Sequence, residues 1–205
     1  MDCSDTTAAP SPTATTPATL SRRSLIASGA ALGAVGLGLL SEHALAKSSA
    51  ESDVVILNYA LGLEYLQAAF YAEAAAAKSL PNPYLRFATI VADHEQQHVD
   101  YLRVALGSKA KSAPKFEFGD ATSDPDKFAS TATTLEDIAV SAYNGAAVML
   151  TRGALRAAAR VVSVDARHAA WIRTLRGQNP AKAATDPGLS QSIVAAQVAR
   201  LGFVR

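Results

Sequence analysis

Two segments seventy residues apart repeat the same residue types in the same order, and this duplication restricts the fold more than any other feature of the chain. The first segment reads Glu95, His98, Tyr101, Leu102, Arg103 and Gly107, and the second reads Asp165, His168, Trp171, Ile172, Arg173 and Gly177. A carboxylate and a histidine three positions apart lie on one face of a helix, about one turn from each other. The repeat therefore predicts two related helices whose polar faces have the same function, and the simplest such function is to bind metal between helices.

The first 46 residues have the features of an export signal. Ser21-Arg22-Arg23 precedes a run of Ala, Gly and Leu that ends near Leu40, and Ala44-Leu45-Ala46 offers a small-x-small cleavage site. The paired arginines resemble a twin-arginine signal, so we expect residues 1–46 to be a signal peptide and the protein to be periplasmic or extracellular. The alternative is an uncleaved membrane anchor, although the run is weaker than the roughly 20 strongly apolar residues that a spanning helix needs.

The remaining residues, 47–205, have the length of one domain with a sizeable core. They hold 17 of the 19 Lys and Arg residues and 15 of the 18 Asp and Glu residues, for a net charge of +2. No basic block appears, which argues against a nucleic-acid partner. The single cysteine is Cys3, so the mature chain has no disulfide, thiolate metal site or cysteine nucleophile.

The apolar periodicity predicts an all-α protein. We expect long helices over residues 53–78, 84–106, 133–151 and 155–176, and a short helix over 189–200. Ser52 is the expected cap of the first helix, and Thr133 and Glu136 form an expected capping box at the start of the third. The long link over residues 107–132 can run the length of a bundle. The prediction is a ferritin-like four-helix bundle with a long crossover between helices 2 and 3.

Five ionisable side chains fall at mid-helix on faces that are otherwise apolar. They are Glu64, Glu95, His98, Asp165 and His168. Because a buried carboxylate without a partner costs several kcal/mol, we expect these residues to meet at a metal site. Carboxylate and imidazole ligands suit Fe, Mn or Zn, and the carboxylate-rich set favours one or two ions of Fe or Mn. Taken singly, Glu64 could instead pair with Arg156 or Arg160. Either histidine could be a core residue whose hydrogen bonds are made to other protein groups.

The third helix breaks the pattern. Aligning Glu64-Tyr65 with Ala142-Tyr143 puts Ala142 opposite Glu64, so a carboxylate of the usual di-iron template is missing. Asn144 is the nearest polar substitute and a weak ligand. This alignment predicts an asymmetric metal pair, a single ion or a degenerate site that binds none.

Several segments resemble one family, the exported ferritin-like domain proteins, which include twin-arginine bacterial proteins and desiccation- or stress-related relatives. They are residues 56–71, the stretch around Glu95 and His98, residues 141–147 and 165–171, and the tail at 186–189. The resemblance implies a ferritin-like fold over about residues 52–200, with metal at the five positions named above.

The expected function is an exported metal-binding protein, either a di-iron or a manganese protein, acting in redox or stress protection. Whether it is an enzyme is left open. The alternative is a non-catalytic structural bundle with a degenerate site. The expected partners are metal ions, with no stable membrane insertion after signal cleavage, and a homo-oligomer is left open.

Residues 94–98 also satisfy the zinc-protease pattern H-E-x-x-H. In that interpretation His94 and His98 bind zinc and Glu95 activates water. No third histidine follows at the usual spacing, and no substrate-binding sheet precedes the motif. The duplicated segment has Val164 in place of His94, so we expect His94 to be an outer-face residue without a role in the site.

Overall fold

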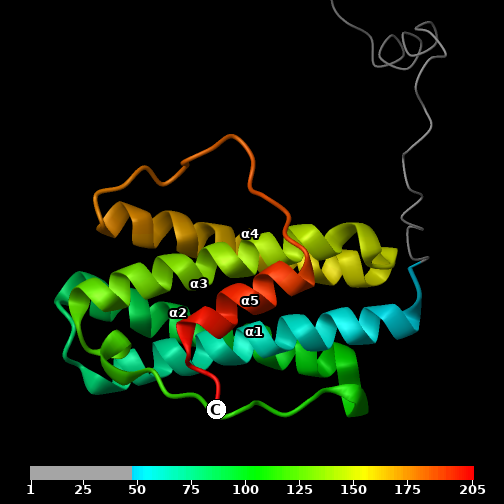
Figure 1. Ribbon diagram of the computed structural model, residues 1–205, viewed down its shortest axis with the longest axis horizontal. Helices are drawn as coiled ribbons and strands as arrows, with labels where there is room; N and C mark the ends of the chain where they lie inside the picture. The colour runs from blue at the N-terminus through cyan, green and yellow to red at the C-terminus, as the bar shows by residue number, and fades with distance from the viewer. Residues whose placement is uncertain (1–47) are drawn as a thin grey trace, which may run out of the picture. The chain divides into compact units, whose positions relative to one another are not determined.

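The computed structural model describes residues 48–205, so the expected signal peptide over residues 1–46 lies outside the described residues. The described chain forms five α-helices and three short 3-10 turns. In chain order they are α1 (Ala50–Ala77), α2 (Asn82–Leu106), η1 (Gly107–Lys109), η2 (Gly119–Thr122), α3 (Pro125–Ala146), η3 (Ala147–Met149), α4 (Arg152–Leu175) and α5 (Gln191–Leu201). The four long helices run lengthwise beside one another (Figure 1), which confirms the predicted ferritin-like bundle.

The helices pack as two hairpins joined by a crossover. The helices α1 and α2 follow each other across a short link and pack together, as do α3 and α4. Between the hairpins, residues 107–124 run along the bundle and carry η1 and η2 (Figure 1). Within residues 48–205, β pairing is limited to one isolated antiparallel bridge between Phe116 in this crossover and Val204 near the C-terminus.

All four long helices begin earlier than the sequence pattern predicted, and the caps of α1 and α3 give the reason for these two. Ser49, rather than Ser52, caps α1: Ser52 N donates to Ser49 Oγ at 3.1 Å, and Ser49 N donates to Ser52 Oγ at 2.8 Å. For α3 the cap is Asp124, whose Oδ1 accepts from the backbone N–H groups of Asp126 and Lys127, with proline at the first helical position.

The predicted capping box of Thr133 and Glu136 is therefore wrong, and the crossover is shorter than expected. Both residues lie well inside α3, because the helix starts at Pro125. The early start places Glu136 at mid-helix, where its side chain is fully buried. Glu136 therefore lies in the interior of the bundle and does not cap a helix.

Apolar side chains form two main clusters, one toward each end of the bundle. One is aromatic, and in it the rings of Phe70 and Phe128 stack with centroids 5.5 Å apart. The other is mainly aliphatic, built around Leu61, Leu102 and Val161. On each long helix the buried carboxylates and imidazoles fall between residues of these clusters, so the polar centre has apolar packing on both sides.

The helix α5 covers α1 and α3. Val194 of α5 is fully buried against Leu63 of α1 and against Ile138 and Ala142 of α3. The tail leading to α5 passes so close to α3 that a Cβ on Gly145 would lie 1.9 Å from a backbone oxygen, so only glycine fits there. Within residues 48–205, no helix combines the length and apolar character needed to cross a bilayer.

Candidate metal centre

Six buried side chains from the four long helices form two overlapping groups in the middle of the bundle. We call the first the His98 half, which consists of Glu64, Glu95, His98 and Asp165. We call the second the His168 half, which consists of Glu95, Glu136, Asp165 and His168. In each half, one potential ligand atom from every residue lies within 4.8 Å of the others. Glu95 and Asp165 belong to both halves, so the groups share two carboxylates.

Both imidazoles direct Nδ1 at these carboxylates. The Nδ1 atom of His98 lies 3.1 Å from Glu95 Oε2 and 3.3 Å from Glu64 Oε2. The Nδ1 atom of His168 lies 3.0 Å from Glu95 Oε1 and 3.5 Å from Glu136 Oε2. The two ring centroids are 6.3 Å apart. The structure thus brings all five residues singled out in the sequence to one centre, with Glu95 between the histidines.

Glu136 is the sixth member, and the sequence interpretation missed it. The expectation that Ala142 leaves the third helix without a carboxylate is wrong, because Ala142 packs in the apolar cluster beneath α5. Aligning Tyr143 with Tyr65 had put the two helices out of register. The correct match pairs Tyr143 with Tyr71, since each tyrosine follows a glutamate by seven residues.

The structure supports this register through two crossed hydrogen bonds. Tyr143 of α3 donates its hydroxyl hydrogen to Glu64 of α1 at 2.6 Å. Tyr71 of α1 donates in the same way to Glu136 of α3 at 2.5 Å. The duplication seen in α2 and α4 therefore extends to α1 and α3. Glutamate followed by tyrosine at this spacing was the signal available in the sequence.

The alternative partners for Glu64 are not used. Its carboxylate contacts the Tyr143 hydroxyl and the His98 imidazole. The guanidinium of Arg160 instead lies over the ring of Tyr101, 5.7 Å from its centroid. The carboxyl group of Glu64 therefore faces the centre of the bundle and not an arginine.

The donor set fits a metal pair. Six buried atoms of these residues have no hydrogen-bond partner among residues 48–205: Glu64 Oε2, Glu95 Oε1, Glu136 Oε2, both Asp165 carboxylate oxygens and His168 Nδ1. Each buried polar atom without a partner costs about 1–3 kcal/mol. A group of such atoms aimed at one centre is the arrangement that cations require. With four carboxylates ionised and both imidazoles neutral, the set carries four negative charges, which two divalent ions would balance.

The pKa values of the metal-free site reflect the burial of several carboxylates and two imidazoles close together. Burial and the nearby Glu95 carboxylate raise the pKa of Glu64 to about 8. Burial, followed by neighbouring carboxylates, raises the pKa of Asp165 well above its ordinary value. Burial lowers the pKa of each histidine, but the carboxylates close to each ring outweigh this effect and raise the pKa of His98 to about 10 and of His168 to about 9. Without metal, the centre therefore holds protons where cations would bind.

His94 joins neither half, yet it is not the isolated outer-face residue that the sequence suggested. Its Nδ1 lies 2.9 Å from His168 Nε2, on the side of that imidazole opposite the carboxylates. A zinc-protease site would need His94 and His98 on one ion, and no such group forms within residues 48–205. His94 and both buried histidines line a surface pocket of about 350 Å³ between α2 and α4. This pocket connects solvent to the imidazoles.

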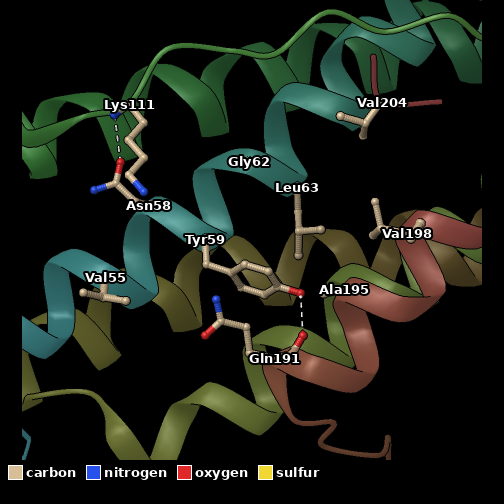
Figure 2. A pocket seen from close by; sticks show the side chains of 11 residues that line it. Val55, Asn58, Tyr59, Gly62, Leu63, Lys111, Gln191, Ala195, Val198 and Val204 are labelled. Carbon is tan, nitrogen blue, oxygen red and sulfur yellow. Dashed lines mark hydrogen bonds between the residues drawn. The ribbon is translucent and has the colours of Figure 1, made fainter. Parts of the chain in front are cut away.

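A second pocket, of about 470 Å³, lies apart from this centre. Figure 2 shows its lining from α1, α5 and the C-terminal residues, with the ring of Tyr59 in the middle. The Tyr59 hydroxyl donates to the backbone oxygen of Gln191, and the amide of Asn58 is occupied by backbone groups, including the N–H of Lys111. None of the six buried carboxylates and histidines lines this pocket.

Comparison with known protein families agrees with the fold. Residues 52–178 match the family of the ferritin-like domain, Ferritin_2. The chain belongs to this family. The matched range of this chain contains all six residues of the centre and ends before α5 begins. No curated protein matches the chain.

Proposed function

We propose that this ferritin-like protein binds two divalent ions of iron or manganese in the middle of its bundle. Glu64 and His98 would hold one ion, Glu136 and His168 the other, and Glu95 and Asp165 would contact both. The observation that carries this proposal is the convergence of buried carboxylate oxygens and an imidazole nitrogen that have no hydrogen-bond partner in the part of the chain that the structure describes. Mixed carboxylate and imidazole ligands favour iron or manganese over softer metals.

When bound, such a metal pair would supply redox or Lewis-acid chemistry toward dioxygen or peroxide. The chain's own residues position and shield it. Tyr71 and Tyr143 orient one carboxylate of each half by hydrogen bonds, which fixes the direction of the remaining oxygen. The apolar clusters at both ends keep water from the centre, and the pocket between α2 and α4 leaves one side accessible. We propose a role in redox protection under stress.

The expected lack of a carboxylate at Ala142 favoured the alternative of a purely structural bundle. Glu136 supplies a carboxylate from the same helix, which supports the metal-binding proposal instead.

Elemental analysis tests the metal proposal. Protein loaded anaerobically with Fe(II) or Mn(II) and then desalted should retain about two equivalents, in keeping with the two halves. Anomalous scattering should locate both ions between the four helices. Retention of less than about a tenth of an equivalent of any transition metal would contradict the proposal.

We also propose export through the twin-arginine pathway, supported by the sequence pattern of residues 21–46. Replacing both Arg22 and Arg23 with lysine should leave the protein in the cytoplasm. Continued export of this variant would contradict the assignment.

A further inference from the structure

We propose that the two metal positions are unequal, and that His94 is a positioning residue which makes the His168 half the first and tighter one. This inference rests on the proposed metal pair. It concerns a residue outside the ligand set, and it follows from a difference between the two duplicated halves.

His94 is placed to fix the orientation of the His168 ring. Its Nδ1 lies 2.9 Å from Nε2 of His168, and the two ring planes are only 17° apart. His168 is therefore held on both edges, by His94 on one side and by Glu95 and Glu136 on the other. Rotation of the ring would break both sets of contacts.

This contact also selects the tautomer that a metal needs. An ion on Nδ1 of His168 requires a lone pair there, so the ring hydrogen must sit on Nε2. Nε2–H then donates to Nδ1 of His94, which must be the acceptor. A hydrogen bond on the far nitrogen of a ligating histidine fixes its orientation and raises its basicity. The geometry of His94 meets this requirement before any metal binds.

The His98 half lacks the equivalent residue. His94 lies four residues before His98 on α2, and the residue four before His168 on α4 is Val164, which has no polar group. Both residues line the same pocket and are half-buried, so their surroundings are similar and their chemistry differs. Within residues 48–205, the contacts of His98 are made through Nδ1 alone.

A second difference adds to the first. Gln67 of α1 donates to Glu136 at 3.2 Å, in addition to the bond from Tyr71. The corresponding residue of α3, three after Glu136, is Ala139, so within residues 48–205 Glu64 has the bond from Tyr143 but no bond from a side-chain amide. Two independent contacts thus preorganise the His168 half, and among the described residues neither has a counterpart in the His98 half.

Two experiments test the inference. Stepwise titration of the full chain with Co(II), monitored by visible absorption, measures the affinity of each binding step. Anomalous scattering from crystals given one equivalent of Co(II) locates the first ion. In the wild type the first ion should occupy the His168 half, with the second binding more weakly. His94→Val, which copies the counterpart residue, should weaken the first step by about 10- to 100-fold and remove the preference. His94→Asn places an oxygen acceptor near the position of Nδ1, so it should restore much of the preference.

The reciprocal variant Val164→His should tighten the second step without changing the first. An unchanged first step and unchanged occupancy in His94→Val would overturn the inference while leaving the metal pair intact. If His94→Val fails to fold, the other two variants test the inference. It would be overturned if the first ion lost its preference for the His168 half in His94→Asn and the second ion bound no more tightly in Val164→His. A wild type that binds no Co(II), Fe(II) or Mn(II) would contradict the proposed function itself.

Discussion

The His98 half and the His168 half of the centre share two carboxylates, Glu95 and Asp165, and have the same ligand types, but their surroundings differ. Each has an imidazole directed through Nδ1 and a glutamate oriented by a tyrosine from the opposite helix. Only the His168 half has Gln67 and His94 as additional partners, where the other half has Ala139 and Val164. The residues that would contact metal are of the same type in both halves, whereas the residues at the positions of Gln67 and His94 differ between the halves.

The largest expected effect comes from removing what the halves share. Glu95→Ala should abolish retention of both ions, because Glu95 contributes to each group and contacts both imidazoles. Affinity should fall by more than about 100-fold, beyond the range typical of residues that only support ligands. Elemental analysis after Fe(II) loading measures this loss. Ala142→Gly is a matched control that should retain two equivalents, and retention of two ions by Glu95→Ala would refute a shared centre.

Removing an unshared glutamate should separate the halves. Glu136→Ala should lose the ion next to His168 and keep the one next to His98, and Glu64→Ala should do the opposite. Each variant should retain about one equivalent, since one complete set of ligands survives. Anomalous scattering distinguishes the two positions. If either variant loses both ions, the two positions are not independent and the division into halves is wrong.

Proton release should accompany binding in both halves. The pKa is about 10 for His98, about 9 for His168 and about 8 for Glu64, so the metal-free protein holds these protons at neutral pH. Metal must displace them, and affinity should therefore rise with pH between 6 and 8, by about tenfold per pH unit for each proton released.

Calorimetry in buffers of different ionisation enthalpy counts the protons released at each step. A pH-independent affinity over this range would show that protons do not occupy the site. A dependence confined to one step would show that the halves differ in protonation as well as in support.

The smallest expected effect concerns the extra hydrogen bond in the His168 half. Gln67→Ala should weaken the ion near Glu136 by about twofold to tenfold, since a hydrogen bond is worth about 0.5–1.5 kcal/mol. Tyr143→Phe is the comparison, because it removes a bond to Glu64 and should affect the opposite half. Stepwise Co(II) titration resolves the two effects. Equal weakening of both steps by Gln67→Ala would indicate a general change in packing.

Much of the site could be predicted from the sequence, because helical geometry fixes which residues share a face. The three-residue spacing of Glu95 and His98, repeated at Asp165 and His168, was enough to expect that these four side chains meet Glu64. Glu136 was missed, because a threonine three residues before a glutamate is also a typical helix start, and that interpretation hid the seven-residue spacing from glutamate to tyrosine that α1 and α3 share. The choice depended on the true start of α3, which Asp124 and Pro125 set eight residues earlier than the pattern had suggested.

The sequence by itself determined the helical bundle, its long crossover and the residue types gathered at the centre, because these follow from periodicity within single helices. Only the tertiary structure decided that α3 contributes Glu136, that the tyrosines cross between helices, and that His94 contacts His168. These features depend on the register between helices, which is set by packing of side chains far apart in the chain. A pattern within one helix shows which residues share a face, but it does not show which side chains of another helix they contact, so the difference between the two halves became visible only in three dimensions.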